Sequence, residues 1–455
     1  MIPGIQVIPT GIQTGDEMND GSVNYICSAG TFAGYRNGRF THVQGIRYAC
    51  SKRFCPPVPF RYEEGVQICD RPAPYAVQCN SKLEYYFSGI EYESLPQEES
   101  PQYLSLTIPD TKETRKPVMV WFHGGGFRNG GCDSPIFNYE LLAGDAGAIL
   151  VGINYRIGIL GFSLDETGKP GHPGLLDALE GLRWVKKNIS GFGGDPENIT
   201  LFGQSAGAEL VRCIILSKGT ENLYNRAILQ SDPIGTMHDR QRMEEEVLAR
   251  VRALPPDISV EELRRAQREI LDGIKEKGLP KYMVFAPRFG VAPLIDAEQI
   301  PQRLKEAAGT HELLIGCTSR EVSIYGGTIP ILAKLDRFIV TRGLIEYLVR
   351  RMSRPIFNGP SREFAQAYAA AGGKVYWYCF DWLEDKSFIA AGHMMDVPLL
   401  FGAEAIEGRE TALSLSPKEI EQSGRVMRQL WGMFARTGCL MDNVRNELLE
   451  LHKIA

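Results

Sequence analysis

The chain has 455 residues, of which 44% are hydrophobic and 23% charged, so it is long enough to bury a large core. Its 50 lysines and arginines against 55 aspartates and glutamates give a formal charge of -5, which provides no basic field for a nucleic-acid backbone. No apolar run approaches the roughly 20 residues of a membrane-spanning helix, and the N-terminus lacks the basic start and apolar core of a secretion signal. We therefore expect a soluble, cytoplasmic protein with no nucleic-acid partner and no membrane span.

The ten cysteines give no indication of a metal centre. Cys50, Cys55, Cys69 and Cys79 lack the paired CxxC spacing that is typical of zinc sites. Ten cysteines are ordinary usage for a chain of this length, and we expect most of them to be buried thiols.

Three short apolar runs have the composition of buried parallel strands. They span residues 118–122, 148–154 and 199–202, and each ends at a glycine-rich or polar loop. Between the second and the third run, apolar residues in "GLLDALEGLRWVKKNI" recur at helical spacing. A strand, a helix and a second strand in this order form the unit of a parallel sheet, so the pattern predicts an α/β fold.

Residues 233–310 are interpreted as an inserted helical region, because much of this stretch has a charged amphipathic helical pattern. Pro255 and Pro256 mark a break in that pattern. Ser259 stands three residues before Glu262, which is the spacing of a capping box at the start of a helix.

The apolar strand pattern returns after the insertion in "ELLIGCTS" and again in "KVYWYCFDW". The chain closes on the helical pattern of "SGRVMRQLWGMFARTG", and we expect residues 415–455 to form a helical segment. No internal repeat or low-complexity segment separates these parts. Residues 1–455 are therefore expected to form a single domain.

The stretch "ITLFGQSAGAEL" places Ser205 between Gly203 and Gly207, after an apolar strand and before a helix. A strand that turns abruptly into a helix strains its central residue, and the flanking glycines leave room because they carry no β-carbon. The turn lifts the hydroxyl clear of the sheet, next to the positive end of the helix. Ser205 is therefore a predicted nucleophile; the alternative is a serine that only caps the helix.

A second element, "HGGGF" at residues 123–127, follows the first buried strand. Acyl transfer passes through a negatively charged tetrahedral intermediate, which needs N–H donors fixed where its oxygen forms. The N–H groups of Gly125, Gly126 and Ala206 could form such an oxyanion hole. The alternative is a flexible or phosphate-binding loop, but neither GxGxxG nor GxxxxGK[ST] is present.

The motifs "FHGGGF", "INYRIGILGF", "GGDPENITLFGQSAGA" and "AILQSD" closely resemble the type-B carboxylesterases, which include the bacterial para-nitrobenzyl esterases and the cholinesterases. The resemblance is specific over residues 116–231, patchy over 232–312 and recognisable again to about residue 438. It implies an α/β-hydrolase fold: a central, mostly parallel twisted sheet flanked by helices, with helical insertions covering the active site.

A serine nucleophile needs a histidine base, and in this fold the acid and then the histidine follow the serine in the chain. Four histidines meet this order: His238, His311, His393 and His452. His393 in "AGHMMDVPLLFG" matches the family's catalytic histidine, whereas His238, His311 and His452 are expected on the surface. The alternative for His393 is a loop histidine that contacts only solvent.

The acid is expected to be Glu321, which lies just beyond the strand "ELLIGCTS" and aligns with the family's Gly-x-x-x-x-Glu-Gly pattern. Val322 stands where the family has the following glycine, so the loop around Glu321 is expected to differ in geometry from that of the family. Asp396, three residues after His393, is the alternative acid, and an exposed loop carboxylate is the alternative for Glu321.

Two further departures from the family pattern concern a disulfide bond and the choice of substrate. Many relatives join a cysteine near Cys79 to a cysteine at the position of Pro101, so that disulfide cannot form here, and free thiols are expected. Cholinesterases have glutamate before the nucleophile, whereas this chain has Gln204, which makes choline esters a poor first guess.

The resemblance and the residues together predict a serine carboxylesterase that hydrolyses small to medium uncharged esters through a Ser-His-Glu triad and an acyl-enzyme. No metal or organic cofactor is expected, and the partner is a small-molecule ester; a monomer and a homodimer both remain open. The same triad could instead act on a lactone, thioester, carbamate or amide. A non-catalytic binding protein is less favoured, because every catalytic role has a candidate residue.

Overall fold

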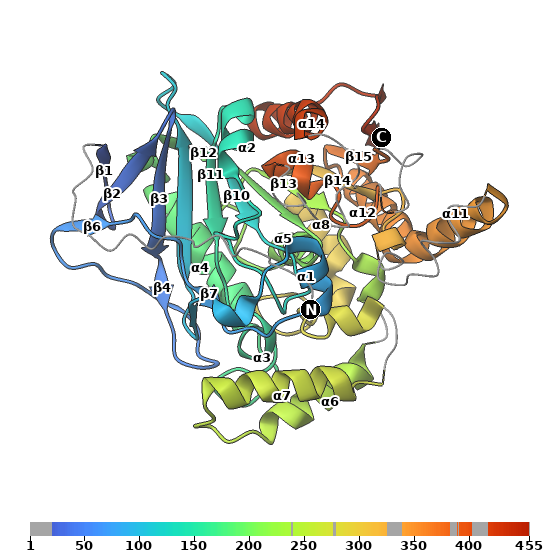
Figure 1. Ribbon diagram of the computed structural model, residues 1–455, viewed down its shortest axis with the longest axis horizontal. Helices are drawn as coiled ribbons and strands as arrows, with labels where there is room; N and C mark the ends of the chain where they lie inside the picture. Colours follow the sequence, from blue (N-terminus) through green and yellow to red (C-terminus); the bar gives the residue numbers. More distant parts are fainter. Residues whose placement is uncertain are drawn as a thin grey trace, which may run out of the picture.

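The computed structural model describes residues 21–237, 240–275, 279–324, 339–382, 389, 391–402 and 417–454. A 13-stranded mixed sheet forms its centre (Figure 1). The strands in sheet order are β1 (Ser22–Cys27), β2 (Gly30–Asn37), β3 (Phe40–Arg47), β9 (Tyr103–Pro109), β11 (Ile149–Ile153), β10 (Lys116–Phe122), β12 (Gly194–Gln204), β13 (Arg226–Gln230), β14 (Glu312–Thr318), β15 (Val375–Phe380), β17 (Leu449–Ile454) and β16 (Val444–Arg445), with β6 (Val66–Ile68) beside β2.

The six strands from β11 to β15 in this order pair in parallel, and the flanking pairs β9–β11 and β15–β17 are antiparallel. The apolar runs at 118–122, 148–154 and 199–202 fall in β10, β11 and β12. All seven residues of β10 are buried, as expected for a parallel strand covered on both faces. The predicted α/β fold is confirmed.

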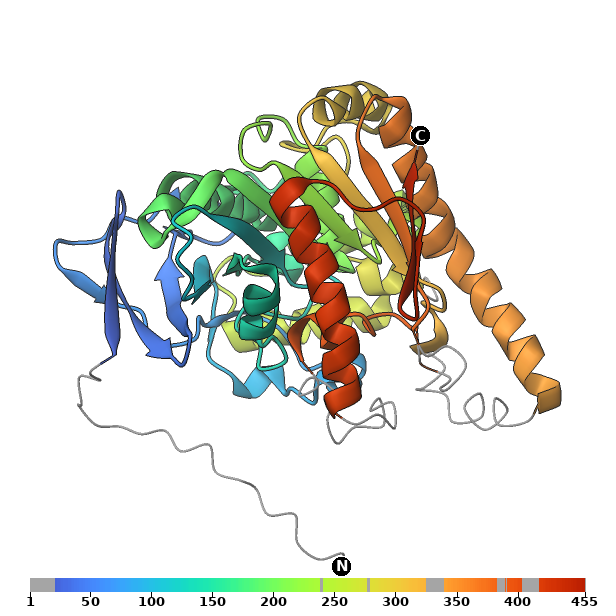
Figure 2. The same cartoon turned by 90° about the horizontal axis from the view of Figure 1, so that it is seen from above.

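Helices cover both faces of the sheet (Figure 2). The helices of the described ranges are α1 (Lys82–Ser88), α2 (Tyr139–Ala146), α3 (Gly158–Gly161), α4 (Pro173–Asn188), α5 (Ala206–Ile215), α6 (Gln241–Arg252), α7 (Val260–Gly273), α8 (Ile300–Ala308), α11 (Ile339–Ser353), α12 (Gly359–Ala370), α13 (Val397–Phe401) and α14 (Pro417–Thr437).

Alternation along β10 divides the core between the two faces. Val118 and Val120 pack in a cluster with residues of α4, α5, α8 and α12, whereas Met119 and Trp121 pack in a second cluster with residues of α2, α13 and α14. Successive side chains of a strand point to opposite faces, so each layer of helices receives every second residue. Burying one large apolar side chain contributes about 1.5–3 kcal/mol, which makes these two clusters the main source of stability.

The insertion between β13 and β14 contains α6, α7 and α8, and α6 and α7 lie side by side at one end of the molecule (Figure 1). The predicted capping box is present at the start of α7. Ser259 Oγ accepts a hydrogen bond from the Glu262 N–H at 3.3 Å, and the Ser259 N–H donates to Glu262 Oε2 at 3.0 Å.

Two parts of the sheet differ from expectation. The antiparallel strands β1, β2 and β3 were not predicted. The segment 415–455 was expected to be helical, but α14 ends at Thr437 and the chain then forms β16 and β17. The reason is the period-2 pattern of "LELHKI", which buries Leu449 and Leu451 and pairs β17 with the edge of β15.

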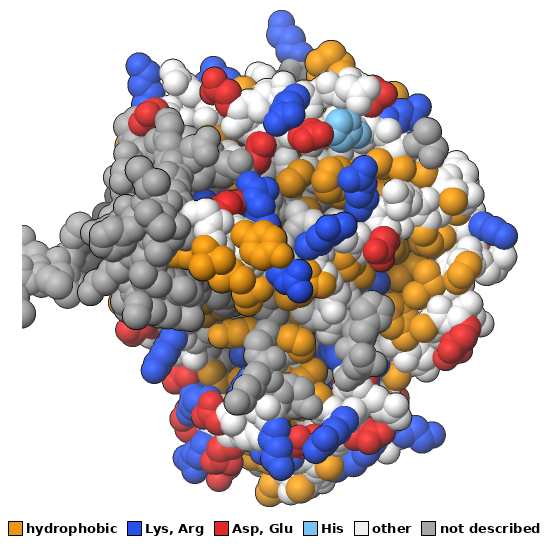
Figure 3. Space-filling model, turned by 90° about the vertical axis from the view of Figure 1, so that its right-hand side faces the viewer, with side chains coloured by type: hydrophobic (Ala, Val, Ile, Leu, Met, Phe, Trp, Pro, Cys, Tyr) orange, Lys and Arg blue, Asp and Glu red, His pale blue; other side chains and the backbone are white. Residues whose placement is uncertain are grey.

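Helix α11 projects from the body of the molecule, and on this side apolar side chains lie among lysines and arginines (Figure 3). Leu344, Tyr347, Leu348 and Met352 are exposed at the spacing of one helical face. Among the helices of the described ranges, none has the length and apolar content that crossing a bilayer requires.

Candidate active site

Ser205 lies between β12 and α5 in a strained turn. Its φ of 57° and ψ of -124° are unusual for a residue with a β-carbon. A β-carbon on Gly203 would lie 2.5 Å from the Gly207 backbone, and one on Gly207 would lie 2.0 Å from the Phe122 carbonyl oxygen. Both glycines are therefore required by the close approach of the chain, and the predicted strand–turn–helix geometry is present.

His393 and Glu321 are joined by a short hydrogen bond between His393 Nδ1 and Glu321 Oε2, at 2.5 Å. The Glu321 side chain is fully buried, and its other oxygen accepts from the Thr318 N–H at 2.7 Å. The His393 N–H also donates to the Glu321 carbonyl at 3.1 Å. These contacts fix the imidazole and the carboxylate relative to each other.

The loop at Glu321 accommodates Val322 in place of the family's glycine. The Val322 side chain is buried, and its N–H donates to Ser353 Oγ at 3.1 Å. The departure in sequence therefore leaves the carboxylate of Glu321 within reach of His393.

Asp396 belongs to a separate polar cluster. Its Oδ2 accepts from Gln230 Nε2 at 2.6 Å, and Trp431 Nε1 donates to Gln230 Oε1 at 3.1 Å. Burial and the charge of Glu321 raise the pKa of Asp396 to about 6, although the hydrogen bond from Gln230 lowers it. In this arrangement the carboxylate that contacts His393 is that of Glu321.

Ser205 and His393 line one cavity. Within the described residues no hydrogen bond joins the Ser205 hydroxyl to His393; instead, Gln204 Nε2 lies 3.3 Å from His393 Nε2. Bonds between a nucleophile and its base are often long without substrate and tighten when it binds. The sequence had singled out Gln204 only as a departure from the cholinesterases, and its contact with His393 was not foreseen.

The glycine-rich loop lies directly against Ser205. A β-carbon on Gly124 would lie 2.8 Å from the Gln204 carbonyl oxygen and 3.4 Å from Ser205 Cβ. Gly125 and Gly126 have φ values of 104° and 63°, which favour glycine. Both glycines line the cavity with Ser205.

The loop is also held rigidly. The Gly125 carbonyl accepts from the N–H groups of Arg128 and Asn129, at 3.0 and 3.1 Å. Burial lowers the pKa of His123 to about 4, so its imidazole is neutral at pH 7, and its Nδ1 lies 2.9 Å from the Gly124 carbonyl oxygen. Together with Ala206, the first residue of α5, the loop can present N–H donors to a ligand at Ser205.

The rest of the cavity wall comes from segments far apart in the chain. Its lining is mostly apolar and includes Leu83, Phe87, Met283, Phe357 and Met394. Two charged side chains, Glu84 and Arg128, also line it, together with Tyr282. Sequence reasoning missed these three residues; the one available signal was the position of Arg128 directly after the glycine-rich motif.

The remaining histidines in the described ranges lie elsewhere. His311 was expected on the surface, which is wrong: it is buried and stacks on Tyr224 at 4.1 Å between ring centroids. Burial lowers the pKa of His311 to about 4. His452 lies on β17, where its ring contacts Asn443 and Glu450. His238 lies outside the described residues.

All ten cysteines are free thiols, and no bridge involves Cys79. The expectation that most are buried is only half right. Five are buried, four are partly exposed and Cys439 is exposed. Cys27, for example, lies on β1 among the antiparallel strands at the edge of the sheet, and others lie on short surface segments. In the described part of the chain, no group of three or more histidine, cysteine, aspartate and glutamate side chains could hold a metal ion.

Comparison with protein families matches residues 23–332 to the Carboxylesterase family. Among curated proteins, the "Probable N-octanoylanthranilate hydrolase AqdA2" of Rhodococcus erythropolis is 33% identical over 428 residues, which cover 91% of this chain and 92% of that protein. The para-nitrobenzyl esterase of Bacillus subtilis (strain 168) is 29% identical over 391 residues, 77% of each chain.

Solved structures show the same relationship. A thermophilic para-nitrobenzyl esterase superposes with a TM-score of 0.75 at 25% identity and covers 93% of this chain and 92% of its own. The Geobacillus stearothermophilus carboxylesterase EST55 superposes with a TM-score of 0.70 at 27% identity and covers 91% of each chain. The sheet and its helical layers are thus those of the α/β-hydrolase fold.

Proposed function

This chain belongs to the carboxylesterase family and is a carboxylic-ester hydrolase, and we propose that Ser205, His393 and Glu321 form its catalytic triad. The observation that carries the proposal is the 2.5 Å bond between His393 and Glu321 at a cavity that Ser205 also lines. A nucleophile, a base and an orienting carboxylate are the three groups that acyl transfer requires.

In the proposed reaction His393 Nε2 removes the proton of the Ser205 hydroxyl as Oγ forms a bond to the ester carbonyl carbon. The carbonyl oxygen becomes an oxyanion, which the N–H groups of Gly125, Gly126 and Ala206 stabilise. The tetrahedral intermediate then loses its alkoxide, which takes the proton from His393 and leaves as the alcohol.

Water completes the cycle. His393 takes a proton from water as its oxygen attacks the acyl-enzyme, and the proton returns to Ser205 Oγ when the carboxylic acid leaves. Glu321 stabilises the imidazolium in both half-reactions and holds the ring by its Nδ1–H. These steps use only groups of the chain.

The proposed acyl group is uncharged and of small to medium size, because aliphatic and aromatic side chains such as Leu83, Phe87 and Met283 line the cavity. Gln204 is neutral and supplies no charge for a quaternary ammonium group. A choline ester is therefore not the proposed substrate.

Amide hydrolysis is a second candidate. One observation favours it: the relative that is 33% identical over nine-tenths of this chain is named an N-octanoylanthranilate hydrolase, and that name describes an amide. The same acyl-enzyme forms from an amide when the base protonates the leaving nitrogen. Measuring octanoate release from N-octanoylanthranilate and from para-nitrophenyl octanoate with one preparation tests this candidate.

The proposal is tested by Ser205→Ala with para-nitrophenyl butyrate as substrate. We expect kcat to fall by at least about 10³-fold, and a fluorophosphonate to add its mass to Ser205 in the wild-type protein alone. Ser217→Ala is the matched control, because this buried serine lies just beyond the opposite end of the same helix and bonds only to backbone. Labelling of another serine, or turnover that survives Ser205→Ala, would refute the triad.

A further inference from the structure

We propose that Arg128 binds a carboxylate of the substrate, so that this enzyme selects esters or amides with a negative charge close to the bond that it cleaves. The inference rests on the proposed function of Ser205 and names the substrate class for the same cavity. It adds a charge requirement to a cavity that is otherwise mostly apolar.

The position of Arg128 is the first observation. The residue follows the Gly124–Gly126 turn by two positions, and its side chain lines the same cavity as Ser205 and His393. A β-carbon on Gly126 would lie 3.5 Å from Arg128 Nε, so the guanidinium lies alongside the loop that approaches the reacting carbonyl. A carboxylate bound there is within a few bonds of the ester carbon.

The second observation is how the guanidinium is held. Its central carbon lies 5.2 Å from the centroid of the Tyr282 ring, and the Tyr282 carbonyl oxygen approaches Gly126. Stacking uses the flat face of a guanidinium, whereas its N–H donors lie in the plane of the group. The contact with the Tyr282 ring limits where the guanidinium of Arg128 can lie, and a guanidinium binds the two oxygens of a carboxylate through N–H donors in its own plane.

The third observation is the balance of charge. Of the described residues that line the cavity, Arg128 and Glu84 are the two with formally charged side chains at neutral pH. Arginine stays protonated at any working pH. Burial raises the pKa of Glu84, while the charges of Arg128 and His393 lower it. A bound carboxylate adds a negative charge that the guanidinium of Arg128 and the imidazolium formed during catalysis favour, and that an ionised Glu84 opposes.

The test uses two pairs of substrates that differ only in charge. The first pair is 3-carboxyphenyl octanoate and 3-carbamoylphenyl octanoate, with the charge on the leaving group. The second is N-octanoyl-3-aminobenzoate and N-octanoyl-3-aminobenzamide, two amides with the charge again on the leaving group. Comparing each ratio of kcat/KM between variants cancels the intrinsic reactivity of the substrates.

We expect the wild-type enzyme to prefer the carboxylate in at least one pair, and Arg128→Gln to reduce that preference by about 10- to 100-fold, mainly through KM. Arg128→Lys should retain part of the preference, because lysine keeps the charge but loses the planar fork. Glu84→Gln should increase the preference. Arg115→Gln is the matched control, since it removes the same charge just before the opposite end of β10.

Equal ratios in wild type and Arg128→Gln for both pairs would overturn the inference, and so would an equal loss for charged and uncharged members, which indicates a structural role. A preference for the carbamoyl esters, or for an ester that carries an ammonium group and depends on Glu84, would also overturn it. In each of these cases Ser205-dependent turnover of the uncharged esters leaves the proposed function standing. Turnover that survives Ser205→Ala refutes the proposed function instead.

Discussion

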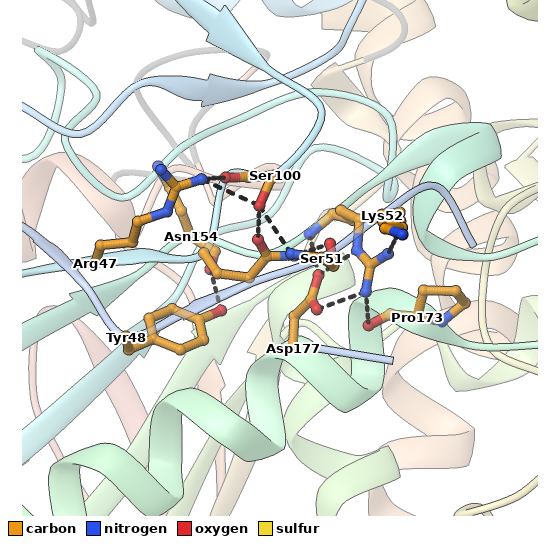
Figure 4. A network of polar contacts seen from close by, with 10 residues as sticks. Arg47, Tyr48, Ser51, Lys52, Ser100, Asn154, Pro173 and Asp177 are labelled. Carbon is orange, nitrogen blue, oxygen red and sulfur yellow. Dashed lines mark hydrogen bonds and ion pairs between the residues drawn. The ribbon is translucent and has the colours of Figure 1, made fainter. Parts of the chain in front are cut away.

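Two buried polar constellations of this molecule are built in opposite ways. Arg156 and Asp177 form a two-pronged ion pair, with Arg156 Nε and a terminal nitrogen each 2.8 Å from a different carboxylate oxygen. The other guanidinium contacts go to the carbonyls of Lys52 and Pro173 (Figure 4). At the proposed active site, by contrast, Ser205 has a strained backbone and lines a cavity.

The Arg156 cluster extends across the sheet. Tyr48 donates to the Asn154 carbonyl at 2.7 Å, and Ser100 joins Arg47 and Gln102 in the same network (Figure 4). The Arg156–Asp177 pair is satisfied within the protein, and the cluster links the segments that flank β3 and β9 to α4. The proposed active site is completed only by a substrate, because Ser205 and the glycine-rich loop line a cavity that the protein does not fill.

The largest effect is expected from Glu321→Gln, which keeps the shape of the acid but removes its charge. Because the imidazolium then lacks its carboxylate, kcat for para-nitrophenyl butyrate should fall by about 10³- to 10⁴-fold. Steady-state kinetics measure this, and circular dichroism checks that the fold is retained. Asp396→Asn is the control and should cost less than about 10-fold in kcat; the reverse order would assign the acid to Asp396.

Next in size is Asp177→Ala, which removes half of the complete cluster. An uncompensated buried guanidinium should lower the free energy of unfolding by about 3–5 kcal/mol, measured in urea, with kcat unchanged at low temperature. The exposed pair of Arg36 and Asp110 is the control: Asp110→Ala should cost less than about 1 kcal/mol. Equal losses of unfolding free energy in the two variants would mean that the buried pair stabilises the fold no more than the exposed pair.

A third, pH-dependent effect is expected at Asp396. Its pKa is raised from 3.8 to about 6 in the folded protein, so the folded state holds this proton more tightly than the unfolded state. Stability should therefore fall as the pH rises from about 4 to about 6, by on the order of 3 kcal/mol, and this contribution stays lost above that range. The side chain of Asp396→Asn cannot ionise. Measured by urea unfolding, the free energy of unfolding of this variant relative to the wild type should therefore increase by that amount between pH 4 and pH 7. A constant difference between the two proteins would contradict this.

The smallest effect is expected from Ser259→Ala, far from both constellations. Loss of the capping hydrogen bond at the start of α7 should lower the free energy of unfolding by about 1 kcal/mol and leave kcat unchanged. Ser259→Asp restores a capping oxygen and should recover most of the loss. A change in kcat would show that the insertion and the active site are coupled.

The sequence predicted those parts of the site that depend on neighbouring residues. The turn at Ser205 and the glycine-rich loop each depend on a motif of no more than about a dozen residues. Glu321 and His393 were predicted from the order of the triad residues in the chain and from the resemblance to the family. Arg128 was visible but had no assigned role, because Tyr282 and Glu84 approach it from distant segments. Strand β17 was missed because the preceding helical pattern of α14 was extended to the end, and the burial of His311 depends on its contact with Tyr224.

The position of β17 links the order of synthesis to folding. β15 precedes its antiparallel partner by about seventy residues, so during translation its outer edge stays open until α14 and the last strand have left the ribosome. An apolar strand with an unpaired edge is a template for association with other chains. A nascent chain that stalls within α14 would therefore expose the unpaired, aggregation-prone edge of β15. This strand lies beside β14, which leads into the Glu321 loop.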